Sequence, residues 1–158
     1  MLLYFMRHGE AEEASAGQGD FGRRLTPRGE KRTQATARVL RKLGVQLSLI
    51  LTSPLTRARQ TAALVGAELA VPVGEEPALA CGCNLERLAE ALEQHPQTDA
   101  VMVVGHEPDF SLMIGELIGH GQVEMRKGAV ACVAVQGLAR GGGVLLWLMA
   151  GKDLAALD

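Results

Sequence analysis

The sequence predicts an α/β fold, a three-layer α/β/α sandwich with a mainly parallel sheet and an antiparallel C-terminal hairpin. Two observations predict it. Through the first two thirds of the chain, short apolar runs typical of buried strands alternate with segments that carry helix signals. Two β-rich runs joined by a glycine-rich loop then follow. The 158 residues, 47% of them hydrophobic, can enclose one sizeable core, so we expect residues 1–158 to form a single domain.

Three apolar runs in the first part of the chain are the expected parallel strands. They lie at Leu2–Met6, Leu47–Ser53 and Ala100–His106, each bounded by polar residues or glycine. The C-terminal hairpin is expected from the runs "AVACVAVQ" and "GVLLWLM", which the seven-residue loop "GLARGGG" joins. We expect this hairpin to extend the sheet with an antiparallel edge.

The first helix is expected after a polar, glycine-rich loop. Thr26 is the expected N-cap and Pro27 the first helical residue, and the helix should run to Leu43 with Gly44 as its stop. Its apolar face is expected to comprise Ala35, Val39, Leu40 and Leu43. Basic residues on its other faces are interpreted as solubilising: Arg28, Lys31, Arg32, Arg38 and Lys42.

Three further helices are expected. Ser53 followed by Pro54 repeats the signature of a cap and a proline, and predicts a helix from about Leu55 to Leu69. A shorter helix is expected from Asn84 to about Gln94, because a proline follows soon after it. The last is expected from Pro108 to Ile118.

The composition argues against several classes of function. A net charge of −2 and 3% aromatic residues give no support for a nucleic-acid partner. The first apolar run is too short for a secretory signal or a membrane span, so we expect no membrane association and a cytoplasmic location. Cys81, Cys83 and Cys132 are expected to be reduced, mostly buried thiols, because "CGC" lacks the spacing of common zinc and redox motifs.

Two histidines and two arginines follow the expected strands and are the candidate functional residues. Arg7 and His8 follow the first strand, Arg57 lies one helical turn after the second, and His106 ends the third. Because open α/β sheets bind ligands outside the carboxyl ends of their strands, we expect these four side chains to converge on one rim.

This set of side chains suits a phosphoryl group. Guanidinium groups donate paired hydrogen bonds to its oxygens, and a neutral imidazole can attack phosphorus. The helices that begin at Pro54 and Pro108 are expected to add unpaired N–H groups at the same place. Gly9 would let an oxyanion approach the backbone closely. The sequence therefore predicts a phosphate pocket that works without metal.

Four ordered motifs resemble the successive signatures of the histidine phosphatase superfamily, the phosphoglycerate-mutase-like fold. They are "MRHGEA", "RLTPRGEKRTQA", "TSPLTRARQTA" and "VVGHEPDFS". The short chain, the "RHGEA" start and the final hairpin are most similar to the SixA-type phosphohistidine phosphatase branch. The resemblance implies that His8 accepts the phosphoryl group while Arg7, Arg57 and His106 bind its oxygens, with no metal or organic cofactor. Water would then hydrolyse the phosphohistidine on His8.

One feature of the superfamily is missing from this sequence. Many members carry an acid between the second and third strands, which protonates the leaving oxygen, and Ala78 stands where we would expect it. Glu75 and Glu76 lie too early and are interpreted as part of a solvated turn. Glu10 and Glu107 are the alternative proton donors, because both lie near the expected pocket.

The missing acid favours a nitrogen–phosphorus substrate. An alkoxide needs a proton donor, whereas a protonated phosphohistidine can release neutral imidazole. Only about thirty residues separate Leu69 from the third strand, which leaves little chain for a lid over a small metabolite. The expected function is hydrolysis of phosphohistidine in proteins, such as histidine phosphotransfer domains. The alternatives are a phosphatase for small esters, with Glu10 or Glu107 as acid, and a non-catalytic phosphate-binding regulatory module.

Overall fold

The computed structural model describes residues 1–14, 19–96 and 98–158, so part of the polar loop after the first strand, residues 15–18, lies outside them. The strands are β1 (Leu2–Arg7), β2 (Leu49–Thr52), β3 (Val73–Glu75), β4 (Ala100–Gly105), β5 (Val130–Val135) and β6 (Gly143–Met149). The helices are α1 (Pro27–Lys42), α2 (Thr56–Leu69), α3 (Leu85–Glu93), α4 (Asp109–Leu117), α5 (Gly151–Ala155) and the 3₁₀ turn η1 (Pro77–Leu79).

The strands form one six-stranded sheet in the order β3-β2-β4-β1-β5-β6. The four strands from β3 to β1 are parallel, with Leu2 opposite Ala100 in the pairing of β1 with β4. β5 then pairs antiparallel with β1 and with β6. The predicted parallel sheet with an antiparallel hairpin at its edge is therefore confirmed.

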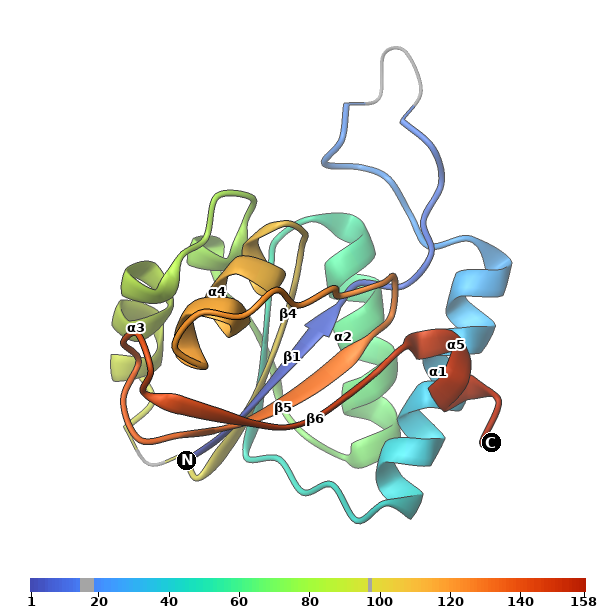
Figure 1. Ribbon diagram of the computed structural model, residues 1–158. Helices are drawn as coiled ribbons and strands as arrows, with labels where there is room; N and C mark the ends of the chain where they lie inside the picture. Colours follow the sequence, from blue (N-terminus) through green and yellow to red (C-terminus); the bar gives the residue numbers. More distant parts are fainter. Residues whose placement is uncertain (15–18, 97) are drawn as a thin grey trace.

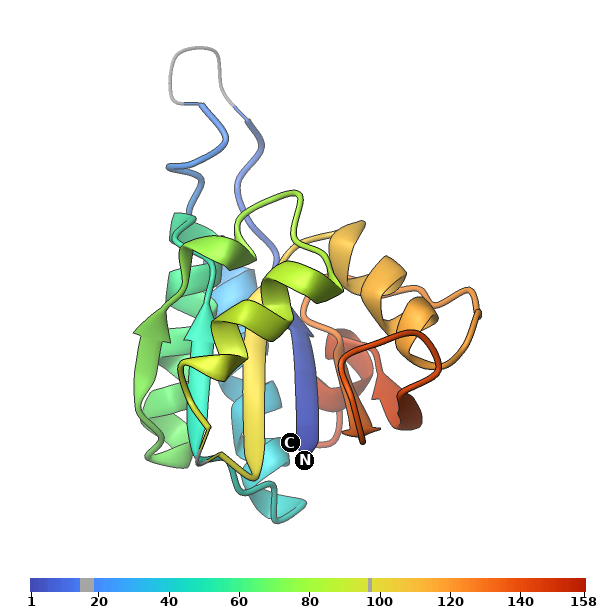
Figure 2. The same cartoon turned by 90° about the vertical axis from the view of Figure 1, so that its left-hand side faces the viewer.

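Helices cover both faces of this sheet, as Figures 1 and 2 show. Residues of α1, α2 and α5 share one core cluster, and residues of η1, α3 and α4 share the other. Along β1 the side chains alternate between the two clusters, with Phe5 in one and Met6 in the other. Because both faces are buried, the strand is apolar throughout, and the predicted three-layer sandwich is confirmed.

The first helix begins and ends as the sequence predicts. Thr26 Oγ1 accepts a hydrogen bond of 3.0 Å from the Gly29 N–H, and Gly44 takes the left-handed conformation with φ of 73° after the last turn. The buried face differs, however. Leu43 is exposed and Ala35 half-buried, whereas Thr33 and Thr36 are buried. Apolar periodicity could not include these two threonines, and Leu43 already lies beyond the last turn.

The start of α2 was predicted within one residue, but its capping residue was predicted wrongly. Ser53 does not cap the helix, which begins at Thr56 after Leu55. The Ser53 hydroxyl accepts a hydrogen bond from the Leu55 N–H and pairs with a histidine of the site, so it is engaged in the turn before the helix. The Thr56 N–H is bonded to the Phe21 carbonyl, and the Ser111 N–H in α4 to the Glu107 carboxylate. These N–H groups of the two first turns are therefore not available to a ligand, contrary to expectation.

Three short elements were not predicted: β3, η1 and α5. They have only three, three and five residues, which is too short for a periodic pattern of apolar residues to show. The hairpin and the other helices match their predicted positions within two residues. Trp147 is only half-buried, and packs edge-to-face on Tyr4 with ring centroids 5.9 Å apart.

The three thiols are free, with Cys83 and Cys132 buried and Cys81 exposed, as expected for a mostly buried set. Within the described ranges, no helix is both long enough and apolar enough to cross a membrane.

Candidate active site

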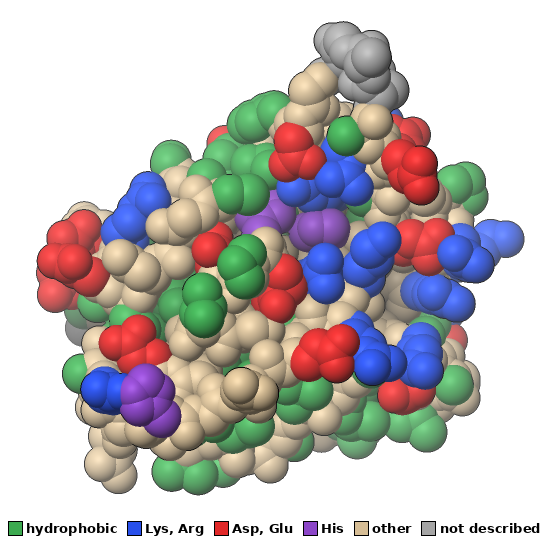
Figure 3. All heavy atoms as spheres, turned by 45° about the horizontal axis from the view of Figure 1, so that its top comes forward, with side chains coloured by type: hydrophobic (Ala, Val, Ile, Leu, Met, Phe, Trp, Pro, Cys, Tyr) green, Lys and Arg blue, Asp and Glu red, His purple; other side chains and the backbone are tan. Residues whose placement is uncertain are grey.

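The carboxyl ends of β1, β2 and β4 bring the predicted residues together. Arg57, from the first turn of α2, donates from Nε to His8 Nε2 at 3.1 Å, and its Nη2 lies 3.4 Å from His106 Nδ1. The two imidazole rings are 5.3 Å apart between centroids. The guanidinium group therefore bridges both histidines, and all three side chains are buried. In Figure 3, histidine side chains lie in a hollow of the surface, with Lys and Arg side chains gathered beside them.

The His8 ring is held with Nε2 toward the pocket. Its Nδ1 lies 2.8 Å from the Gly9 carbonyl oxygen, which can only accept a hydrogen bond, so Nδ1 carries the proton. Nε2 then has a lone pair and accepts the hydrogen bond from Arg57. In this tautomer the lone pair of the ring lies on Nε2.

His106 is held by a different contact. Its Nε2 lies 2.7 Å from Ser53 Oγ, and its Nδ1 faces Arg57, which can only donate. Nδ1 is therefore the acceptor, and Nε2 donates to the Ser53 hydroxyl. Ser53 thus positions His106, a role that the sequence did not reveal because the residue was interpreted as a helix cap.

Burial keeps both histidines neutral. Desolvation lowers the pKa of His8 to about 3, and the positive charges of Arg57 and Arg7 add to this shift. Desolvation and Arg57 likewise lower the pKa of His106 to about 4. At neutral pH the ring of His8 is therefore uncharged, which is the state that a nucleophile requires.

Arg7 supplies a second guanidinium group at the same rim. Its Nη1 donates to the Met125 carbonyl at 2.9 Å, while its buried Nε has no hydrogen-bond partner in the described part of the chain. Burial lowers the pKa of Arg7, and the nearby Glu107 carboxylate opposes that shift. An unpaired buried N–H is costly, so this donor fits an anion that binds beside it.

Gly9 has a different reason for being glycine than the sequence suggested. Its N–H donates to Thr61 Oγ1 at 3.0 Å, so it is already paired. A Cβ on Gly9 would lie 2.7 Å from Thr33 Oγ1, because α1 packs directly against this turn. Glycine at this position lets α1 pack closely against the turn. The close approach of an oxyanion is not needed to explain why the residue is glycine.

Asp20 is a site residue that sequence reasoning missed. Arg57 Nη2 and Nη1 donate to its carboxylate and its backbone carbonyl, both at 2.8 Å. Together with Arg23, this contact lowers the pKa of Asp20. The residue comes from the polar loop between β1 and α1, where no periodicity indicates which side chain turns back to the sheet.

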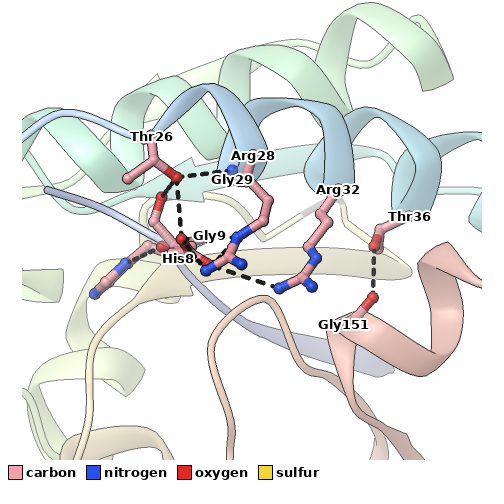
Figure 4. Close-up of polar contacts among 9 residues, drawn as sticks. His8, Gly9, Thr26, Arg28, Gly29, Arg32, Thr36 and Gly151 are labelled. Carbon is pink, nitrogen blue, oxygen red and sulfur yellow. Dashed lines mark hydrogen bonds and ion pairs between the residues drawn. The ribbon is translucent and has the colours of Figure 1, made fainter.

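Glu10 is poorly suited to be the proton donor. Arg28 donates to both of its carboxylate oxygens, and Arg32 forms an ion pair with it at 3.4 Å. Figure 4 shows the side chains of Arg28 and Arg32 on the same side of α1. Hydrogen bonding from Arg28 is the main cause that lowers the pKa of Glu10. A carboxyl group held in its charged form is a weak acid catalyst.

The other carboxylates near the site are also engaged. Both oxygens of Glu107 accept hydrogen bonds from Ser111, at the start of α4. Glu76 caps η1 by accepting from the Ala78 N–H, and Glu75 pairs with Arg59 at the end of β3. Ala78 itself carries no titratable group. Among the described residues, there is no cluster of three or more His, Cys, Asp or Glu side chains that could hold a metal ion.

The chain is similar to a known protein family and to individual known proteins. The model of the histidine phosphatase superfamily (branch 1) matches residues 3–80. An uncharacterized protein of Picosynechococcus sp. is 41% identical over 127 residues, which are 77% of this chain and 75% of that protein.

Several solved structures have the same fold as this chain. The structure of the protein histidine phosphatase SixA complexed with tungstate has a TM-score of 0.86 and 28% sequence identity, and the match covers 98% of this chain and 99% of that chain. The alpha-ribazole phosphatase from Shigella flexneri has a TM-score of 0.75 and 21% identity, over 96% and 97% of the two chains. The second likeness indicates the fold alone.

Proposed function

The chain belongs to the histidine phosphatase superfamily, and we propose that it is a metal-independent phosphohistidine phosphatase that acts on proteins. The observation that carries this proposal is the contact of one buried guanidinium group, Arg57, with both histidines. A neutral nucleophile, His8, thereby lies next to fixed positive charge. Transfer of a phosphoryl dianion needs this combination, because negative charge spreads over its equatorial oxygens during the reaction.

In the proposed reaction, His8 Nε2 attacks phosphorus, and the bond from phosphorus to the substrate nitrogen breaks. Arg7 and Arg57 bind the equatorial oxygens, and His106 joins them when its Nδ1 takes up a proton, which the negative charge of the bound phosphoryl group favours. The leaving imidazole carries the proton that its ring held before transfer, so it departs as a neutral group. Water then attacks the phosphorus on His8, which regenerates the neutral imidazole and releases inorganic phosphate.

The choice of substrate rests on the missing acid. Glu10 is held as a carboxylate by arginines, Glu107 is engaged by Ser111, and Ala78 cannot donate a proton. A phosphate ester would lose the factor of ~10² to 10⁴ that a general acid contributes. Phosphohistidine does not need it.

The surroundings of the pocket support a protein as the carrier of the phosphoryl group. Phe21 follows Asp20 at the rim and is 57% exposed, which places an apolar side chain beside a charged pocket. Aromatic residues are enriched in protein interfaces. The chain is also 28% identical to the protein histidine phosphatase SixA over almost its full length.

The test compares a phosphohistidine protein with a phosphate monoester as substrate. We expect wild-type protein to release phosphate from a phosphorylated histidine phosphotransfer domain with a much higher kcat/KM than from p-nitrophenyl phosphate. His8→Ala should abolish turnover of both, whereas the matched variant His95→Ala, far along the chain at the end of α3, should retain it. A chelator should leave the rates unchanged.

Three results would contradict the proposal. A large preference for the ester would favour a small-molecule phosphatase of the same fold. Wild-type activity of His8→Ala would exclude the covalent mechanism. If the substrate stays unaltered and no acid-labile phosphoryl group can be trapped on His8 after rapid mixing, the protein is a non-catalytic phosphate-binding module.

A further inference from the structure

A second hollow with basic walls opens beside the candidate active site. This basic cleft has a volume of about 350 Å³ and is lined, among others, by Arg7, Arg32, Thr33, Arg126, Lys127 and Lys152. It shares Arg7 with the active site, but His8, Arg57 and His106 do not line it. The backbone explains why the two lie side by side: the His8 carbonyl accepts from the Gly128 N–H, directly after Lys127.

The charges of the basic cleft do not cancel. Its two carboxylates are already paired, Glu10 with Arg32 and Glu124 with Arg126. Lys127 and Lys152 are exposed and have no ion pair or hydrogen bond within the described residues. With Arg7, they leave three positive charges facing the hollow, which favours an anion.

A buried hydroxyl group in the wall gives independent support for a ligand. Thr33 is 2% exposed, and its Oγ1 has no hydrogen-bond partner in the described parts of the chain. The equivalent side chain one turn further along α1, Thr36, does have one, the Gly151 carbonyl at 3.4 Å, as Figure 4 shows. Buried hydroxyl groups are normally paired, so the Thr33 side chain brings an unpaired hydroxyl group to the wall of the cleft.

The walls of the cleft are held in place by their backbones. Gly128 has a φ of 72°, and a Cβ on Gly151 would lie 2.5 Å from the Gly128 carbonyl oxygen. The segment that carries Arg126 and Lys127 is therefore packed directly against the start of α5, where Lys152 lies. Arg126, Lys127 and Lys152 therefore lie on two segments that contact each other, not on a separate loop.

We propose that the basic cleft is an anion subsite that binds a second oxyanion of the substrate, a carboxylate or a further phosphate, next to the phosphoryl group at His8. The inference rests on the proposed function in one respect: it assumes that a phosphoryl group binds at His8. An acidic side chain near the phosphohistidine of a substrate protein is one source of this oxyanion. The other source is a molecule that carries several phosphate groups. The two experiments below distinguish these sources.

The first experiment measures binding without turnover. Calorimetry compares inorganic tripolyphosphate with inorganic phosphate on wild-type protein, Lys127→Met, Lys152→Met and Thr33→Val. We expect each variant to bind tripolyphosphate about fivefold more weakly, with phosphate affected by less than about twofold. Lys31→Met is the matched control, because it removes an exposed lysine of α1 that does not line the cleft, and it should bind both as the wild type does.

The second experiment uses two phosphohistidine peptides that differ only in glutamate or glutamine residues around the phosphohistidine. If the oxyanion comes from a protein, the wild type should prefer the glutamate peptide in kcat/KM, and Lys127→Met and Lys152→Met should lose this preference. If it comes from a polyphosphate, only tripolyphosphate binding should depend on the lysines. Either result supports the subsite.

The proposal is overturned if the lysine variants match Lys31→Met in both experiments. Failure of the proposed function is a separate result. In that case neither peptide would be hydrolysed, while tripolyphosphate binding would still report on the cleft. Thr33→Ser, which keeps the hydroxyl group, should bind tripolyphosphate as the wild type does, so a loss in Thr33→Val alone cannot be ascribed to altered packing.

Discussion

At the scale of single residues, the candidate site depends most on Arg57. Its donors reach His8, His106 and both the carboxylate and the carbonyl of Asp20. A lysine has one ammonium group and could not contact these partners at the same time. The positive charge and the orientation of both imidazoles therefore come from the same planar group.

Asp20 limits how tightly this group can hold a phosphate. Its carboxylate occupies Arg57 Nη2, and its charge repels a dianion. We expect Asp20→Asn to lower the inhibition constant of inorganic phosphate by about fivefold, since the ion pair is half exposed to solvent and of modest strength. Steady-state inhibition by phosphate measures this. An unchanged or higher inhibition constant would mean that Asp20 orients Arg57 and does not compete with the ligand.

The sequence predicted the convergence of Arg7, His8, Arg57 and His106, and the structure brings them to one rim. This was possible because each follows a strand, and the ends of parallel strands share one edge. Their catalytic roles stay predictions. Asp20 and Ser53 could not be predicted, because loop and turn geometry decides where they point. The nearness of Glu10 to the pocket could be predicted from its place after the first strand, but the arginines that keep it charged could not.

At the scale of elements, the packing of α1 on the turn after β1 defines one side of the site. Gly29, in the first turn of α1, lies against the backbone of Glu10, and a Cβ there would collide with the Glu10 carbonyl oxygen. This contact is why the motif "TPRGE" contains a glycine where the helix would otherwise favour alanine.

The packing can be tested by substitution. We expect Gly29→Ala to lower the free energy of unfolding by about 2 kcal/mol or more, because overpacking against backbone outweighs the better helix propensity of alanine. Urea denaturation measures this. Gly137→Ala is the control, since a Cβ there meets nothing within 4 Å and should be nearly neutral. Equal stability of the two variants would show that α1 can shift without cost.

The long, periodic elements were predicted from the sequence, and the short or locally determined ones were not. The cap at Thr26 and the stop at Gly44 follow local backbone chemistry, which a sequence displays. The predicted cap of α2 was wrong because Ser53 bonds to His106, a partner 53 residues away along the chain. β3 and α5 are stabilised by packing against larger elements, and their few residues carry no period of their own.

At the scale of the whole molecule, the site makes stability depend on pH. His8 and His106 are buried with pKa values of about 3 and 4, while the usual value is 6.5. Below pH 6.5 the unfolded chain therefore binds protons that the folded protein does not. Their contribution to stability is complete above the unfolded pKa and is lost as pH falls toward the folded values.

We expect the free energy of unfolding to fall by about 2 kcal/mol for each of the two histidines between pH 7 and pH 5. This window lies above the usual pKa range of carboxyl groups, so the carboxylates add little to the slope. Denaturant unfolding at a series of pH values measures it. Substitution of both histidines by glutamine should remove most of the slope, and a wild-type stability that is flat over this range would contradict the burial argument.

The fold class as a whole was predicted correctly, because strand and helix alternation and the final hairpin are long-range patterns in the sequence. The single-domain organisation and the cytoplasmic location stay predictions. The basic cleft could not be foreseen, since it joins α1, the segment after α4 and α5, and the arginines of α1 were interpreted as merely solubilising. Two of them, Arg28 and Arg32, pair with Glu10 instead, and Arg32 lines the cleft.

The strand order has a consequence for how the molecule comes into being. β1 lies between β4 and β5, so both of its neighbours in the sheet come more than ninety residues later in the chain. At ribosomal speed, on the order of ten seconds pass before both can pair with it. During that time the apolar side chains of β1 lack the strands that cover them. His8, which follows β1, therefore reaches the geometry described above only after β4 and β5 have been synthesised.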